Sequence, residues 1–491
     1  MSDLAKSELS PRESDQAEIT VAWSIHAKYS AILFLVFVAY LEFNAQRMLH
    51  DQDTYWHIVV GRSIWQSGEL PTVDQYSHTL GGARWIAKEW LSQLMLYGAY
   101  ALGSWPGVTL LTAVVAATSY AVLFSWLQRR LEPIVALTLT LVSVSLTVNS
   151  LLARPQIFYY LLLTLCVCGL TDAVERKRTP WWLIPLVALW ANVHASFPIA
   201  IILSALFGFE AIVSARPEER SRQLVRWPIV TLGAAAATGL TPYGFEPLLV
   251  SMQIAGTKAT DYINEWQPAG FTLHGAYGAA FLIGSLAIVL ASGVSRARVL
   301  PLLVCGGLML RHVRFFSLFG IVASAALAGP VAKRFRRFAS RGEAPSAAVQ
   351  RRASIAVGAA IAAVIGVLAL GPRPVPPPNL VPSAALEAAR EYGASGPVFN
   401  DYMFGGYLIF AGVKTFMDGR AELYFNGLFE KTHDAELGSD DAPFLQLLDR
   451  YQVTWALLMP GSAGIAKLSR SPHWKEIYQD EAAFVFVKLD D

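Results

Sequence analysis

Long hydrophobic stretches alternate with short polar turns from residue 29 to residue 370. Several of these stretches reach the ~18 apolar residues that indicate a membrane-spanning helix. Together they predict a mostly α, polytopic transmembrane helix bundle with about eleven spans, give or take helices that lie at the membrane surface. The predicted spans are residues 29–46, 107–127, 135–148, 156–170, 181–190, 198–213, 229–240, 276–290, 299–310, 315–328 and 355–370.

The turns between the stretches fall into two alternating sets. One set is rich in lysine and arginine, as in residues 129–130, 175–178, 216–226 and 333–352. Basic turns favour the cytoplasm, so the pattern predicts a cytoplasmic N-terminus and a C-terminus on the outer, periplasmic side. The opposite set would face the periplasm. It contains Asp51, Gln52, Asp53, His57, Asp74, Glu89, Arg154, His194, Glu265, Arg311, His312 and Arg314.

Polar segments also divide the chain into predicted domains. Residues 1–28 lack the cleavage site of a signal peptide, which predicts a cytoplasmic tail that is disordered over its first twenty residues. Residues 29–371 form the predicted transmembrane domain, with a long first periplasmic loop over 47–88. Prolines make residues 372–381 a stiff linker.

The remaining residues, 382–491, predict a small periplasmic α/β domain. Short β-prone runs bounded by turn residues alternate there with helical patterns. The predicted strands are 397–399, 414–417, 453–459 and 483–488, and the predicted helices are 383–392 and 444–450.

Composition narrows the class of protein. Hydrophobic residues make up 54% of the chain and charged residues 15%, which is far from a soluble average. The net charge is +2, and the basic residues lie in turns rather than along one face, so we expect the lipid bilayer and not a nucleic acid as partner. The three cysteines lie in apolar stretches, which predicts packing rather than disulfide or metal chemistry.

The first outer loop holds the strongest chemical candidate. Asp51 and Asp53 follow the first span, and residues 54–66 have helical spacing that ends at Gly68. A carboxylate at the membrane surface could accept a proton while a hydroxyl attacks a sugar carried by a lipid phosphate, and an inverting transfer needs one such base. An Asp-x-Asp triplet is also common by chance. The alternative is a solvated loop in which Asp53 caps the helix.

Several motifs then resemble a known superfamily. The chain is similar to a widespread group of bacterial membrane proteins within the GT-C superfamily of integral-membrane glycosyltransferases. The resemblance covers nearly the whole chain and rests on Asp53-Thr54-Tyr55-Trp56-His57, Gly61, Gly68, Pro71, Asp74, Ser77, Thr79, Trp85, Glu89-Trp90-Leu91, Arg154-Pro155-Gln156, Trp190-Ala191-Asn192-Val193-His194, Pro242-Tyr243-Gly244, Glu265-Trp266, Arg311-His312, Gly405-Gly406-Tyr407-Leu408 and Asp418-Gly419-Arg420.

This resemblance implies a polyprenyl-phosphate-sugar donor, an inverting transfer and a periplasmic site, with a glycan, lipid or protein as acceptor. Asp53 matches the first-loop acid of the superfamily best, with Asp51 as its substitute. Many members hold a divalent metal with a second acidic pair in a later loop. Here the later loops offer Asp261 and Glu265, well separated, so a metal such as Mg or Mn stays an open question.

The other candidates each have a plainer alternative. Arg154, Arg311, His312 and Arg314 could bind the lipid phosphate, or anchor helices at the membrane interface. His194 could serve the substrate or, with Asn192, cap the break between two short apolar halves. The remaining substrate-binding candidates are His57, Asp74 and Glu89, in or next to the first outer loop. His57 and Glu89 could orient Asp53 or a metal, or could instead make structural bonds within the loop.

Two further alternatives concern the whole protein. Asn400-Asp401 and Asp418-Gly419-Arg420 could cap a membrane cavity, or only shape the loops of the outer domain. A non-catalytic scaffold or binding protein of envelope assembly would keep the same fold without the chemistry. A transporter would distribute polar residues through the membrane, whereas here they gather at one side.

Overall fold

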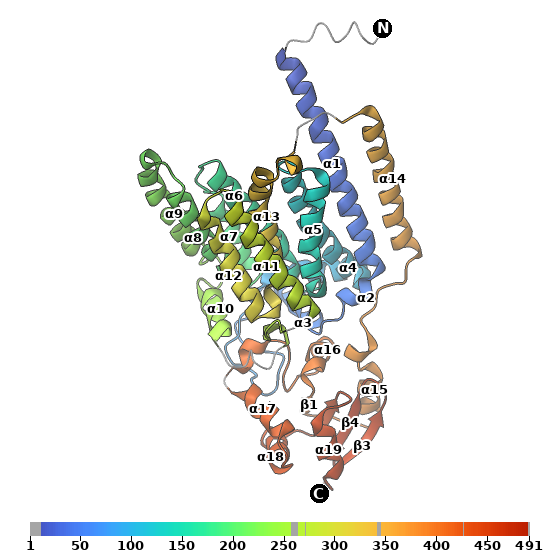
Figure 1. The fold of residues 1–491 in the computed structure, drawn as a ribbon. Helices are drawn as coiled ribbons and strands as arrows, with labels where there is room; N and C mark the ends of the chain where they lie inside the picture. The colour runs from blue at the N-terminus through green and yellow to red at the C-terminus, as the bar shows by residue number, and fades with distance from the viewer. Residues whose placement is uncertain (1–10, 257–263, 271, 341–344, 426, 490–491) are drawn as a thin grey trace.

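The computed structural model describes residues 11–256, 264–270, 272–340, 345–425 and 427–489. It shows a long helical bundle with a smaller lobe at one end (Figure 1). The helices of the bundle coincide with the predicted hydrophobic stretches. They are α1 (Pro11–Phe43), α4 (Trp90–Gln128), α5 (Pro133–Thr147), α6 (Gln156–Glu175), α7 (Leu183–Val193), α8 (Pro198–Val213), α9 (Pro217–Ala237), α11 (Leu273–Ala291), α12 (Val299–Arg311), α13 (Phe316–Arg334) and α14 (Ala347–Leu370).

Length and hydropathy identify the protein as a multi-pass membrane protein. Within the described ranges, seven helices are long and apolar enough to cross a membrane, and α7 and α8 are shorter apolar helices. The figure of about eleven spans stays a prediction. α13 forms the centre of the bundle, because its side chains are buried without a break from Phe316 to Ala328. Small residues such as Gly320 and Ala323 allow close helix packing there.

Three helices begin well before the predicted stretches. α9 begins at Pro217 and α14 at Ala347, both inside predicted basic turns. α1 begins at Pro11, inside the predicted N-terminal tail. Proline suits the first turn of a helix, and this segment is rich in good helix formers. The stretch predicted at 107–127 is the second part of α4, which is separated from a first helical part, residues 90–103, by a break in the helical geometry. α4 is kinked at Ser104, where φ is 53° and ψ is −145°, and Pro106 follows within the helix.

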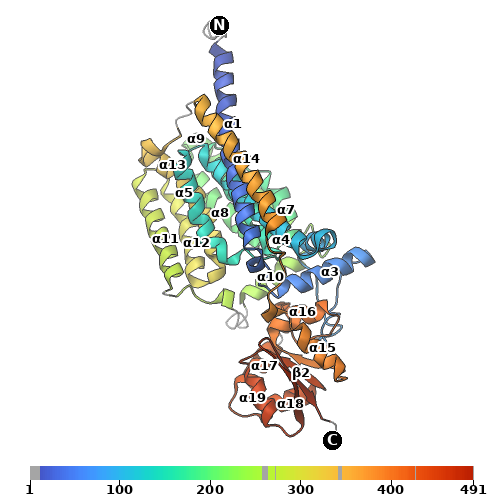
Figure 2. The same ribbon diagram turned by 90° about the vertical axis from the view of Figure 1, so that its right-hand side faces the viewer.

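Short helices build the end of the bundle that carries the lobe. α3 lies crosswise there (Figure 2) and ends at Gly68, whose φ of 70° closes the helix as predicted. Gly61 lets α3 contact α4, since a Cβ at this position would lie 2.1 Å from the Gln93 carbonyl oxygen. The short helices at this end are α2 (Ala45–Met48), α3 (Asp53–Ser67), α10 (Glu246–Gly256), η1 (Val148–Ser150), η3 (Asn264–Trp266) and η5 (Val313–Phe315).

The C-terminal lobe, Ser383–Lys488, contains a four-stranded sheet in the order β1-β2-β4-β3. β1 runs parallel to β2, and the other two pairs are antiparallel. Alternate residues of β2 face two separate apolar cores, one shared with α15 and α16 and the other with α18. The elements are β1 (Val398–Asn400), β2 (Trp455–Leu458), β3 (Trp474–Gln479), β4 (Phe484–Lys488), α15 (Ser383–Glu391), α16 (Gly405–Phe410), α17 (Leu428–Leu437), α18 (Ala442–Arg450) and α19 (Ala463–Arg470), with η8 (Tyr402–Phe404) and η9 (Ala421–Tyr424).

Three of the predicted strands are confirmed as β1, β2 and β4. The strand predicted at 414–417 is wrong, because Thr415 makes only an isolated bridge to Ser77 of the first loop. β3 was not predicted, since most of its residues are partly or fully exposed and its sequence lacks a continuous apolar face.

The lobe is fastened to the first outer loop by this bridge and by a buried ion pair. The Thr415 N–H donates to the Tyr76 carbonyl at 3.0 Å, and the His78 N–H donates to the Thr415 carbonyl at 3.0 Å. Next to them, Arg420 donates to Asp74 at 2.6 Å and, through two nitrogens, to Asp418 at 2.8 and 2.7 Å. All three side chains are fully buried.

Removing the cation of this buried network should destabilise the lobe. In Arg420→Ala two buried carboxylates lose their partner, and we expect a loss of about 3–5 kcal/mol in the free energy of unfolding. Hydrogen exchange of the β1 and β2 amides would measure it. The control is Arg470→Ala, which removes a pair with Asp441 whose arginine side chain is 60% exposed, and it should change little. Equal losses in the two variants would contradict the role given to Arg420.

Candidate functional site

A cavity of ≈ 750 Å³ opens where the helical bundle, the first outer loop and the C-terminal lobe meet. The loop before α3, the start of α6 and the break between α7 and α8 form its membrane side. η8 and η9 close it from the lobe. Most of the predicted site residues line this cavity, namely Asp51, Asp53, His57, Glu89, Arg154, His194, Glu265 and Arg314.

Asp53 is the more accessible of the two acids in the first loop. Its side chain is 22% exposed, against 7% for Asp51, so Asp53 has the better access to a substrate. The Trp56 indole N–H donates to Asp53 Oδ1 at 3.0 Å, and Arg154 Nη1 lies 3.6 Å from Asp53 Oδ2. Asp51 in turn accepts the Asp53 backbone N–H at 2.7 Å. The Asp51 side chain therefore binds the first N–H group of α3, and Asp53 is the first residue of this helix and not its cap.

Burial and mutual repulsion change the acidity of this pair. Burial raises the pKa of Asp53 well above its usual range, the neighbouring Asp51 raises it further, and Arg154 opposes both effects. Burial also raises the pKa of Asp51, again against the attraction of Arg154. A carboxylate with a raised pKa is a stronger base, which suits proton abstraction.

Glu89 forms a second polar group with two histidines on another part of the wall. It accepts the Ala195 N–H at 3.1 Å and lies 3.6 Å from His194 Nε2 and 4.0 Å from His57 Nε2. Burial raises the pKa of Glu89 and lowers the pKa of both histidines, so the imidazoles are neutral at pH 7. Neutral rings and a carboxylate offer hydrogen-bonding atoms for hydroxyl groups.

Asn192 and His194 lie at the break between α7 and α8, and their side chains have different partners. The Asn192 side-chain amide donates to the Ala188 and Leu240 carbonyls at 2.8 and 3.0 Å, and thus joins α7 to the segment after α9. His194 instead faces the cavity, held by a 2.7 Å hydrogen bond between Nδ1 and Ser196 Oγ.

Two cations of the cavity have different neighbours. Arg314, in η5, lies over the Trp266 ring with 4.3 Å between the guanidinium carbon and the ring centre. No described carboxylate lies within 4.0 Å of it, so its charge faces the cavity without an acid in direct contact. Lys88 lines the cavity and pairs with Glu422 of η9 at 2.5 Å.

Sequence reasoning missed four residues of the wall. Lys88 adjoins the predicted Glu89, and Glu422 follows the Asp418-Gly419-Arg420 motif. Their position next to predicted residues was the feature of the sequence that could have identified them. Trp56 and Tyr402 carried no signal of their own beyond their place in or near a motif. All four lie against the cavity: Trp56, Lys88, Tyr402 and Glu422.

Three predicted site residues do not line the cavity. Asp74 is buried in the ion pair with Arg420, which makes it part of the joint between loop and lobe. Arg311 is exposed at the last residue of α12. His312 Nδ1 lies 2.5 Å from the Trp266 carbonyl oxygen, so its ring joins η5 to η3.

The donor set of the cavity does not fit a divalent metal. Arg154 lies among the three nearest acids, Asp51, Asp53 and Glu265, in the position that a bridging ion would need. Over the part of the chain that the structure describes, no three His, Cys, Asp or Glu side chains are grouped as metal ligands. Asp261, the other later-loop acid, lies outside the described residues.

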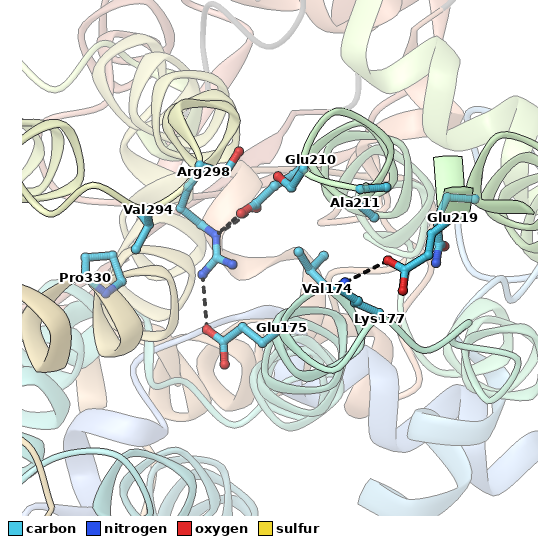
Figure 3. Close-up of a pocket in the computed structure, with 13 residues that line it drawn as sticks. Val174, Glu175, Lys177, Glu210, Ala211, Glu219, Val294, Arg298 and Pro330 are labelled. Carbon is cyan, nitrogen blue, oxygen red and sulfur yellow. Dashed lines mark hydrogen bonds and ion pairs between the residues drawn. The ribbon is translucent and has the colours of Figure 1, made fainter. Parts of the chain in front are cut away.

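The opposite end of the bundle also holds buried charges. In a smaller pocket of ≈ 240 Å³, Arg298 donates to Glu210 at 2.7 Å and lies 3.6 Å from Glu175, while Lys177 pairs with Glu219 at 2.7 Å (Figure 3). Polar clusters are therefore not confined to one side of the membrane. These charges pair with each other across helix ends, which is a structural task.

No protein-family model matches the sequence, and no curated protein matches it. Solved structures do match. The oligosaccharyltransferase of Archaeoglobus fulgidus, in the apo form, is 11% identical with a TM-score of 0.54, over 87% of this chain and 69% of its own. ArnT from Cupriavidus metallidurans has a TM-score of 0.50 both in the apo state, at 14% identity, and bound to undecaprenyl phosphate, at 12%. Both ArnT comparisons cover 93% of this chain and 97% of ArnT. The chain therefore has the fold of the GT-C membrane glycosyltransferases.

Proposed function

We propose that the protein is a bacterial inner-membrane glycosyltransferase that moves a sugar from a polyprenyl-phosphate donor to a glycan, lipid or protein acceptor. The transfer takes place on the periplasmic side and inverts the anomeric carbon. The observation that carries the proposal is Asp53, a carboxylate with a raised pKa that faces a cavity between the bundle and the lobe. The same fold in ArnT binds undecaprenyl phosphate, which supports a polyprenyl-phosphate donor here.

The proposed reaction needs two groups in the cavity, a base for the acceptor hydroxyl and a cation for the leaving phosphate. The acceptor hydroxyl gives its proton to Asp53 as its oxygen bonds to the anomeric carbon. The bond from that carbon to the phosphate oxygen breaks, and the lipid phosphate leaves with the electron pair. Arg314 is our candidate to stabilise this phosphate, because no described carboxylate lies within 4.0 Å of it. Arg311 and His312 do not line the cavity, so we do not propose them as ligands of the lipid phosphate.

The wall also contains an apolar part that suits the lipid chain. Ile199 of α8, Ile254 of α10 and Phe315 of η5 line the cavity beside the polar residues. On α10, Leu249 and Met252 are 58% and 64% exposed, so this helix also presents an apolar surface outside the cavity. A polyprenyl tail would lie along this surface while its phosphate reaches Arg314.

Removal of the proposed base should stop transfer and leave the fold intact. We expect Asp53→Asn to lower the transfer rate by about 10²–10⁴-fold, because the amide cannot accept the proton. Cells that carry the variant should accumulate the lipid-linked sugar, which mass spectrometry of extracted lipids would detect. Glu69→Gln changes an exposed acid of the same loop and is the matched control. An unchanged transfer rate in Asp53→Asn would rule out Asp53 as the base. A cellular function that survives in the variant without measurable transfer would favour the scaffold alternative.

The raised pKa of Asp53 predicts the pH dependence of the reaction. The base acts when ionised, so the transfer rate should rise with pH through a pKa above the usual range of an aspartate. Asp51→Asn removes one of the charges that raise this pKa, and the midpoint of the profile should move to lower pH. Profiles of kcat/KM for the two proteins would measure the shift. A midpoint that moves upward would contradict this assignment.

The lobe should position the base through a glycine. A Cβ at Gly419 would lie 1.8 Å from Asp53 Oδ1 and 2.9 Å from Trp56 Nε1, so Gly419→Ala has to displace the carboxylate. We expect kcat to fall at least about tenfold with little change in thermal stability, since a small misplacement of a catalytic group is costly. Gly358→Ala on α14, where no atom lies within 4 Å, is the control. An unchanged kcat in Gly419→Ala would show that the lobe does not set this position.

A further inference from the structure

Arg154 lies at the centre of the acidic part of the cavity, and all three of its guanidinium nitrogens have partners. Nη1 is 3.0 Å from Asp51 Oδ2 and 3.6 Å from Asp53 Oδ2. Nη2 pairs with Glu265 Oε1 and donates to Gln156 Oε1 at 2.7 Å, while Nε donates to the same oxygen at 3.1 Å. The guanidinium therefore contacts four side chains of the cavity wall, those of Asp51, Asp53, Gln156 and Glu265.

The partners come from separate parts of the chain. Asp51 and Asp53 belong to the first outer loop, Arg154 precedes α6, and Glu265 lies in η3 between α10 and α11. The Arg154 side chain is only 13% exposed. A cation in this position joins its own segment to two others, whose carboxylates would otherwise repel each other.

This arrangement uses the same oxygen atoms that a divalent ion would need. Mg²⁺ and Mn²⁺ prefer carboxylate oxygens at about 2.0–2.2 Å in a regular shell. Asp51 Oδ2, Asp53 Oδ2 and Glu265 Oε1 all point at the guanidinium instead. A metal among them would have to displace a buried arginine from four partners and would meet its positive charge.

We infer that Arg154 is the resident cation of the site and replaces a divalent metal in holding Asp51, Asp53 and Glu265. It is a positioning residue: it sets where Asp53 presents its carboxylate and is not free to bind the lipid phosphate. The positioning role rests on the proposed function. The claim that the acidic cluster takes no divalent ion does not depend on it.

Manganese binding to the purified full-length protein in detergent tests the inference without any sugar transfer. Electron paramagnetic resonance of added Mn²⁺ would count bound ions in wild type and in Arg154→Met, which keeps an unbranched stem and loses the charged guanidinium group. We expect no bound Mn²⁺ in wild type and a new site in Arg154→Met. The affinity should rise at least about tenfold, because the positive charge close to the site is gone. Asp51→Asn in the Arg154→Met background should abolish the new site.

Arg314→Met is the matched control, because it removes another cation of the same cavity that has no described acid within 4.0 Å. It should leave Mn²⁺ binding as in wild type. A wild-type site that is lost in Asp51→Asn would overturn the inference, even if Arg154→Met does not fold. A folded Arg154→Met that binds Mn²⁺ no better than wild type would also overturn it. Loss of transfer in Asp53→Asn tests the proposed function separately.

Discussion

The ion pair between Asp74 and Arg420 is the contact on which the geometry of the site depends. It joins the first outer loop to the lobe in a fully buried position, where neither charge tolerates the loss of its partner. Gly419, next to Arg420, is thereby placed against the Asp53 carboxylate. Gly406 contacts the same loop, since a Cβ there would lie 2.0 Å from the Gln52 carbonyl oxygen. These contacts with the lobe therefore limit where the Asp53 carboxylate can lie in the cavity.

Buried arginines hold acids together at both ends of the bundle, with different outcomes. Arg298 has Glu210 and Glu175 as partners, and these charges pair across helix ends. Arg154 faces three carboxylates, so a single positive charge does not balance them. The surplus of negative charge contributes to the raised pKa of Asp53. The same kind of contact only pairs charges at one end, and at the other it lies beside a carboxylate with a raised pKa, the base of the proposed reaction.

The sequence predicted the helices well because hydrophobic stretches have a direct physical cause, the apolar interior of the membrane. It also predicted which turns would gather, and most of the candidates in those turns share the cavity. It could not predict that Asp74 is buried with Arg420, because these residues are 346 positions apart and nothing local pairs them. Arg311 and Arg314 differ because α12 ends between them, and the turn into η5 directs only Arg314 inward. The direction of a side chain in such a turn leaves no repeating hydrophobic pattern in the sequence, so it could not be predicted.

The distribution of the site along the chain has a consequence for its synthesis. Asp53 emerges from the ribosome early, but its neighbours Arg154, Glu265 and Gly419 follow over most of the remaining translation. Until the last hundred or so residues are complete, the first loop has no partner for Asp74, and the acids near Asp53 stay hydrated. A truncated chain that inserts its helices normally would thus lack the buried surroundings that raise the pKa of Asp53. Under the proposed function, unfinished copies of this protein would not transfer sugar.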